Sequence, residues 1–113
     1  MLIKLINKHT LIVDDFKFKC CIGKNGSKKT KKEGDKATPK GTFNINQLYY
    51  RIDRGRQTIS KLKTKIIKKN MGWCDDPNNR FYNKEIKINS KIKCEKLFRK
   101  DYKYDLFLVI EYN

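Results

Sequence analysis

The chain has 113 residues, of which 28 are Lys or Arg and 12 are Asp or Glu, so its formal net charge at pH 7 is +16. This length favours a single domain, and a Leu, Ile, Val and Phe content of roughly a quarter is enough for a small packed core, which excludes a disordered chain. No apolar run approaches the ~18 residues of a membrane span. Residues 1–13 lack the uninterrupted apolar stretch of a secretory signal peptide.

The first 21 residues predict a meander of three strands. Apolar residues 2–6 and 11–13 are separated by a polar turn at 7–8, and two aspartates follow the second segment. Residues 16–21 then alternate between Phe or Cys and mostly Lys, which is the period-two pattern of a strand with one polar face.

A long basic loop is predicted over about residues 23–40, which are rich in Gly, Lys, Ser and Thr and contain only Pro39 as a proline. Loops of this length are uncommon and are usually functional or mobile. Strand character returns over residues 41–50, a polar loop is predicted over 51–58, and residues 63–69 again alternate.

The carboxyl-terminal part predicts a turn, a helix and two strands. Residues 75–79 read Asp-Asp-Pro-Asn-Asn, a strong turn signal, and residues 86–88 suit a short strand. Residues 90–100 form the one helix candidate, with Ser90 as its cap. The apolar run in 106–112 suits a central strand covered on both faces. The predicted fold class is therefore mainly β with one short helix.

The positive charge is concentrated between residues 17 and 70. Residues 17–40 and 47–70 each carry a net charge of +7, while residues 1–16 are neutral and 71–113 carry +2. Such a region favours a polyanionic partner such as nucleic acid, an acidic membrane surface or an acidic polymer. An alternative explanation of the positive charge is the codon bias of an AT-rich genome. Of the 28 basic residues, 23 are Lys, and the chain is also rich in Asn and Ile.

The chain offers few groups for metal binding or nucleophilic catalysis. Its cysteines are Cys20, Cys21, Cys74 and Cys94, with no C-x-x-C pair, and His9 is its single histidine. We therefore predict neither a zinc site nor a built-in Cys/His pair. Cys20 and Cys21 are expected on opposite faces of a strand, and all four cysteines are interpreted as reduced thiols.

Two features of the sequence allow a nucleic-acid interpretation as well as a structural one. Residues 23–26 read G-x-x-G, which KH domains use between two helices to clamp a nucleic-acid backbone. Here the flanking residues are a strand pattern and a flexible loop, so a glycine-bearing turn is favoured. The aromatic residues of the chain would allow base stacking, but aromatic side chains on strands more often form the core.

Two segments together resemble the L,D-transpeptidase catalytic domain of the YkuD family. The first pairs Ile22-Gly23-Lys24-Asn25-Gly26 with residues 33–43, which contain Thr38-Pro39-Lys40-Gly41-Thr42-Phe43. The second is the Gly72-Trp73-Cys74-Asp75-Asp76-Pro77 block, with similarity continuing through Tyr82-Asn83, residues 95–97 and 102–104, and Glu111-Tyr112-Asn113. The resemblance spans about residues 22–113 and is closest to a compact bacterial branch. It implies one partial L,D-transpeptidase-like domain, a β-sandwich fragment, over residues 1–113.

The resemblance also implies an activity in peptidoglycan cross-linking. In the family a Cys attacks a carbonyl of a peptidoglycan stem peptide with a His as its base, and an amine of a second stem resolves the thioester. Both groups belong to a segment expected after Tyr112-Asn113, so no catalytic residue is assigned and Cys74 is not taken as the nucleophile. No metal or organic cofactor is implied.

Three explanations remain open. The first is that the chain is part of a longer reading frame. The second is that it is a catalytically inactive relative that binds cell-wall material. The third is that it is a basic module that binds an anionic polymer such as nucleic acid. A truncated sheet would leave residues 106–112 as an apolar edge, so self-association is expected. The compartment is left open, because the family acts outside the cytoplasm while residues 1–13 contain no export signal.

Overall fold

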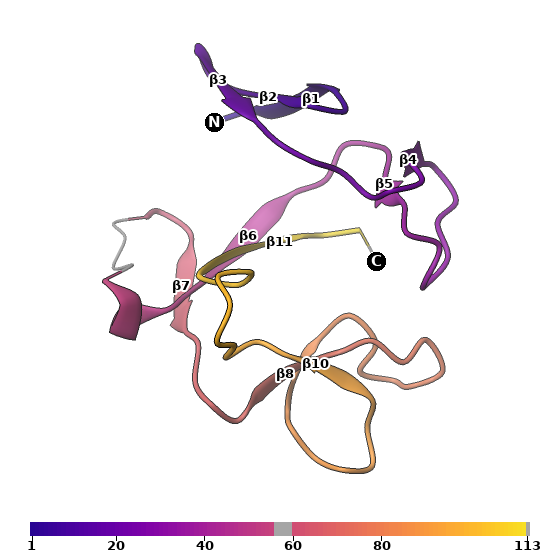
Figure 1. Ribbon diagram of the computed structural model, residues 1–113, viewed down its shortest axis with the longest axis vertical. Helices are drawn as coiled ribbons and strands as arrows, with labels where there is room; N and C mark the ends of the chain where they lie inside the picture. Colours follow the sequence, from indigo (N-terminus) through magenta and orange to yellow (C-terminus); the bar gives the residue numbers. More distant parts are fainter. Residues whose placement is uncertain (56–59, 113) are drawn as a thin grey trace. The chain divides into compact units, whose positions relative to one another are not determined.

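The computed structural model describes residues 1–55 and 60–112, and nearly all of its regular structure is β (Figure 1). The chain divides into two compact units, Met1–Thr42 and Phe43–Asn113, each of which is described by itself. The mainly β prediction is confirmed, and the only helical element among the described residues is a single 3-10 turn, η1 (Ile52–Arg54). That residues 1–113 make one domain stays a prediction.

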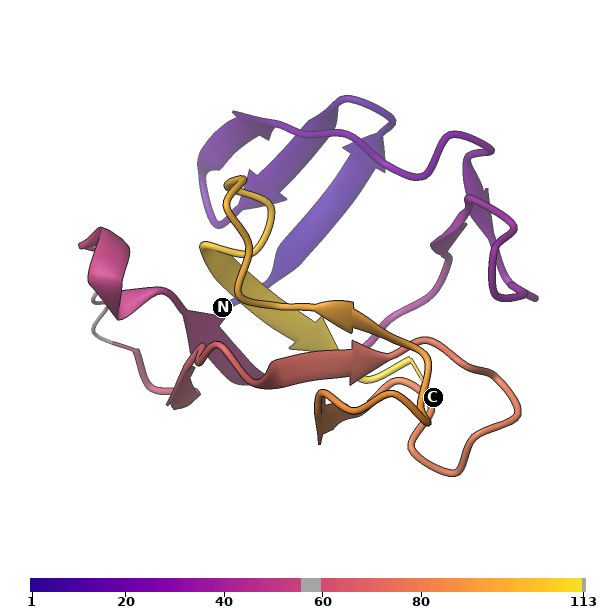
Figure 2. The same cartoon turned by 60° about the horizontal axis from the view of Figure 1, so that its bottom comes forward.

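The first unit begins with the predicted meander. Strands β1 (Ile3–Asn7), β2 (Thr10–Val13) and β3 (Phe16–Lys19) form an antiparallel sheet in the order β1-β2-β3 (Figure 2). Asp14 takes a left-handed φ of 52° in the tight turn between β2 and β3, a conformation that aspartate tolerates better than most residues. Because β3 ends at Lys19, the predicted third strand is two residues too long.

The predicted long loop of the first unit contains a small parallel strand pair. β4 (Ser27–Lys28) pairs with β5 (Thr38–Pro39), with Ser27 opposite Thr38. Pro39 is compatible with this pairing although it has no N–H to donate. The next residue, Lys40, donates its N–H to the carbonyl of Lys28 at 2.9 Å. The loop is therefore ordered by hydrogen bonds between its own residues.

The described residues of the second unit form two three-stranded sheets. One has the order β11-β6-β7, with β6 (Ile45–Tyr50) central, β7 (Lys63–Ile66) parallel to it and β11 (Leu106–Ile110) antiparallel. The other has the order β10-β8-β9, with β8 (Met71–Cys74) between β9 (Glu85–Lys87) and β10 (Cys94–Lys96). The buried cluster of this unit is Tyr49, Ile67, Met71 and Leu97.

The helix predicted over residues 90–100 is wrong. The Asn89 side-chain oxygen accepts the N–H groups of Lys91 at 2.9 Å and Ile92 at 3.1 Å, which makes a turn. Residues 94–96 then pair with β8, and Leu97 is buried in the core. Sheet pairing supplies backbone partners for this segment, so tertiary contacts override a weak helical pattern.

The prediction that residues 106–112 form a central strand is also wrong. β11 lies at the edge of its sheet among the described residues, and its side chains alternate. Phe107 and Val109 pack against the core, whereas Leu106, Leu108 and Ile110 are 48%, 42% and 41% exposed. The apolar run therefore has one covered and one accessible face. Of the loop predicted over 51–58, residues 56–59 lie outside the described part.

Candidate functional site

The two motif halves of the first unit meet in the folded loop. The Gly23 N–H donates to the Thr38 hydroxyl oxygen at 2.8 Å, and the Asn25 N–H donates to the Lys36 carbonyl at 2.9 Å. A Cβ at position 23 would lie 2.5 Å from the Lys36 oxygen and 2.8 Å from the Ala37 Cα. Only glycine allows this approach, so the G-x-x-G of residues 23–26 is part of a strand-end turn.

A carboxylate closes the tip of the same loop. Asp35 accepts hydrogen bonds from the backbone N–H groups of Lys32 at 2.8 Å and Ala37 at 2.9 Å, and from the Lys31 ammonium at 3.2 Å. The two backbone donors, helped by Lys31, lower the pKa of Asp35 to about 2. Asp35 therefore stays ionised and holds the basic loop together. Sequence reasoning missed this role of Asp35. An Asp side chain that accepts the N–H of the residue two positions later forms an Asx turn, and Asp is common at such positions in loops.

The Trp-Cys-Asp-Asp-Pro block places its side chains on both faces of β8. The Trp73 indole lies 5.1 Å from the Phe107 ring and 6.2 Å from the Tyr49 ring, measured between centroids. Cys74 points to the other face and is fully buried. Asp76 then accepts the Asn78 N–H at 3.0 Å, which confirms the predicted turn. The block is thus a central strand followed by a tight reversal.

The cysteines and the histidine do not form an activated pair. The Cys20 N–H donates to the His9 carbonyl at 2.9 Å, but among the described residues no hydrogen bond joins the imidazole to a thiol. Burial, with Asp75 and Cys74 nearby, raises the pKa of the Cys94 thiol. A nucleophilic cysteine needs its thiolate, so this environment opposes such a role for Cys94.

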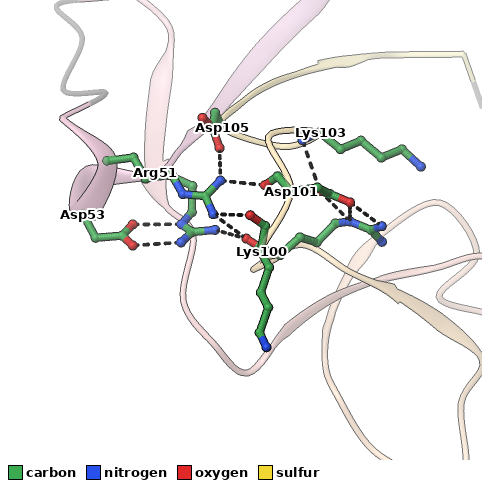
Figure 3. Close-up of polar contacts among 8 residues, drawn as sticks. Arg51, Asp53, Lys100, Asp101, Lys103 and Asp105 are labelled. Carbon is green, nitrogen blue, oxygen red and sulfur yellow. Dashed lines mark hydrogen bonds and ion pairs between the residues drawn. The ribbon is translucent and has the colours of Figure 1, made fainter.

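Two arginines of the predicted basic region are used inside the second unit (Figure 3). Arg51 donates to both carboxylate oxygens of Asp53 at 2.8 Å and to the Arg99 carbonyl at 2.8 Å, and its guanidinium lies 3.6 Å from the Phe98 ring centroid. It is only 4% exposed. Three of its N–H groups and one face of its guanidinium are in contact with groups of this chain, and the side chain is buried, so Arg51 is not part of a basic binding surface.

Arg54 makes the same kind of contact with the segment that leads into β11, of which Lys100, Asp101 and Asp105 are labelled in Figure 3. It donates to the carbonyls of Arg99 and Lys100 at 2.9 Å and of Asp101 at 2.6 Å, and to the Asp105 carboxylate at 2.6 Å. Several acceptors on one loop match the fixed fork of a guanidinium. Sequence reasoning missed these hydrogen bonds because the acceptors lie about 50 residues from Arg54 in the sequence.

The Glu85 carboxylate, which lies next to the core, is also committed to structural contacts. Glu85 accepts a hydrogen bond from the Tyr49 hydroxyl at 2.9 Å and forms an ion pair with Lys65 at 2.7 Å. Burial, together with Glu85, raises the pKa of Tyr49 well above its ordinary value. Within the described residues no three His, Cys, Asp or Glu side chains are grouped to hold a metal ion. None of the helical structure described is long and apolar enough to cross a membrane.

The comparison with family models identifies a matching domain family. The model of the L,D-transpeptidase catalytic domain, YkuD, matches residues 5–108, which include the loop of the first unit and the Trp73 block of the second. No curated protein and no solved structure matches the chain. The family match covers most of the sequence and begins before residue 22, where the motif resemblance starts.

Proposed function

The chain belongs to the YkuD family of L,D-transpeptidase catalytic domains, and from this premise we propose that it serves as scaffold in peptidoglycan cross-linking by cysteine acyl transfer. The observation that carries the proposal is the family match over residues 5–108, which takes in both motif-bearing segments. In that reaction a thiolate attacks an amide carbonyl of a donor stem peptide and an amine leaves. The amine of a second stem then attacks the thioester, and the new amide is the cross-link.

We further propose that none of the four cysteines is the nucleophile of this reaction. Cys74 has no solvent exposure, and Cys94 has a thiol pKa shifted upwards. Cys20 is hydrogen-bonded to His9 only through the backbone, and among the described residues neither its thiol nor that of the exposed Cys21 has a hydrogen bond to the imidazole. A reactive cysteine instead needs an accessible thiolate next to a base. The catalytic His and Cys would then come from sequence outside these 113 residues.

Acylation of the purified chain by a donor stem tetrapeptide tests both parts of the proposal. We expect no thioester by intact-mass measurement and no release of the terminal amino acid. A longer polypeptide that adds a His and a Ser/Thr-x-Gly-Cys element should form the adduct on its added Cys. An acyl group mapped to Cys20, Cys21, Cys74 or Cys94 would contradict the scaffold assignment.

A second candidate function is the binding of an anionic polymer by the loop of residues 23–40. Its support is the exposure of six lysine side chains there, namely Lys24, Lys28, Lys29, Lys32, Lys36 and Lys40. Retention of the chain on peptidoglycan sacculi and on single-stranded nucleic acid, each measured over a salt series, separates the two candidates. Nucleic-acid binding that weakens steeply with salt, without wall affinity, would favour this second function.

A further inference from the structure

Cys74 and Cys94 lie directly opposite one another on the adjacent antiparallel strands β8 and β10. Opposite residues in such a pair send their side chains to the same face of the sheet. A Cβ built on Gly72, which shares that face, would lie 2.8 Å from the Cys94 sulfur. The sulfur therefore rests over the bare backbone of Gly72, two residues from Cys74 along β8, and both thiols belong to one face.

The backbone of Cys74 forms hydrogen bonds on the side of β8 away from Cys94. Its N–H donates to the Lys84 carbonyl at 3.0 Å, and its carbonyl accepts the Asn83 N–H at 2.9 Å. In an antiparallel ladder, a residue that bonds one neighbour in this way faces the other neighbour as a non-hydrogen-bonded pair.

The bonds on either side of the cysteine pair agree with this assignment. The Asp75 N–H donates to the Lys93 carbonyl at 3.3 Å, and the Leu97 N–H donates to the Met71 carbonyl at 3.2 Å. These are hydrogen-bonded positions of the β8–β10 ladder, and Cys74 and Cys94 fall between them. The Cα atoms of a non-hydrogen-bonded pair are about 4.5 Å apart, which is within the range of about 4.4–6.8 Å that a disulfide requires.

The two thiols differ in access. Cys74 is fully buried, whereas Cys94 is half-buried and is the one that a small reagent can reach. Burial raises the pKa of the Cys94 thiol, which lowers its thiolate fraction. Reaction is therefore expected to begin at Cys94 and to be slow, and the buried partner completes it.

We propose that Cys74 and Cys94 are a cross-strand disulfide site that responds to small-molecule disulfides such as oxidised glutathione. The Cys94 thiol loses its proton to solvent and its thiolate attacks one glutathione sulfur, which breaks the oxidant's S–S bond and releases one glutathione. The Cys74 thiolate then attacks the Cys94 sulfur and releases the second. Two protein thiols lose two electrons and two protons, and the oxidant is reduced to two thiols. This proposal does not depend on the acyl-transfer assignment.

Thiol mapping of the full chain over a series of glutathione ratios tests the proposal. After alkylation and non-reducing digestion, mass spectrometry should find the peptides of Cys74 and Cys94 linked. The folded chain should need at least about tenfold less oxidised glutathione to form this link than the chain in urea, because the sheet holds the sulfurs together. Equal requirements in the two conditions, or preferred pairing with Cys20 or Cys21, would overturn the proposal.

Two variants keep the test decisive. The double variant Cys20→Ser/Cys21→Ser retains the proposed pair, so it should still form the link and should unfold at higher urea after oxidation, with reversal by a dithiol. Loss of the link in this variant would refute the site. Cys94→Ser removes the accessible partner, and Cys74 should then resist glutathionylation in the folded chain. Rapid glutathionylation of Cys74 in that variant would contradict the order of attack.

Discussion

The Trp73 indole meets the Phe107 ring edge-on, with centroids 5.1 Å apart and an angle of 82° between the ring planes. Trp73 belongs to β8 of one sheet and Phe107 to β11 of the other, so this contact joins the two sheets of the second unit. Tyr49 of β6 completes the aromatic cluster, with its ring centroid 5.6 Å from that of Phe107. The motif block thus supplies a partly buried side chain that packs against the core of the second unit and joins its two sheets.

Replacing this indole is expected to destabilise the second unit. Trp73→Ala should lower the free energy of unfolding by about 3 kcal/mol, because it removes an aromatic side chain packed between two sheets. The matched control is Tyr102→Ala, since Tyr102 is 79% exposed and contacts Arg54 by a cation–π interaction. Its cost should stay below about 1 kcal/mol in the same urea titration. Equal losses for the two variants would show that Trp73 has no special packing role.

The buried guanidinium of Arg51 makes several hydrogen bonds in a fixed geometry that a lysine ammonium does not reproduce. Arg51→Lys keeps the charge but loses the fork that reaches Asp53 and the Arg99 carbonyl, so we expect a loss of about 1–3 kcal/mol in unfolding free energy. The exposed Arg80, substituted by Lys, should change stability by less than about 0.5 kcal/mol. Denaturation followed by tryptophan fluorescence measures both, and a neutral Arg51→Lys would contradict the structural tie.

The loop of the first unit should depend on pH through Asp35. Its pKa of about 2 is below the ordinary 3.8 of an unfolded Asp, so its stabilising contribution is present above about pH 4. That contribution is lost as pH falls toward 2, when the carboxylate is protonated. NMR titration of the Lys32 and Ala37 amide signals should show a midpoint near the lower value. Asp35→Asn should remove that transition, and a midpoint at 3.8 or above would refute the assignment.

The accessible face of β11 predicts self-association of the chain. Leu106, Leu108 and Ile110 are each more than 40% exposed on a strand at the sheet edge, and such edges pair with other chains. Sedimentation should detect species larger than a monomer, despite the +16 charge. Leu108→Lys should shift the distribution toward monomer, whereas Thr64→Lys on the β7 edge serves as the control. A monodisperse monomer of the unsubstituted chain would contradict this prediction.

The local pattern was sufficient for elements whose hydrogen-bond partners are near in sequence. The meander of residues 3–19 and the turn after Asp75 follow from alternation and turn residues alone. The pattern failed for residues 90–100, where the apolar spacing suits either a helix or an irregular strand. Pairing of Cys94 with Cys74, twenty residues away, decided that case.

Residue types and short motifs were enough to establish the β class, the family and the glycine-dependent turn at Gly23, because each is encoded locally. The folded arrangement was needed to show that β11 is an edge strand, that Arg51 and Arg54 are bound within the chain, and that Cys74 faces Cys94. These outcomes depend on which strands become neighbours. Strand order is set by the sum of many weak long-range contacts, and no short segment of the chain encodes that sum.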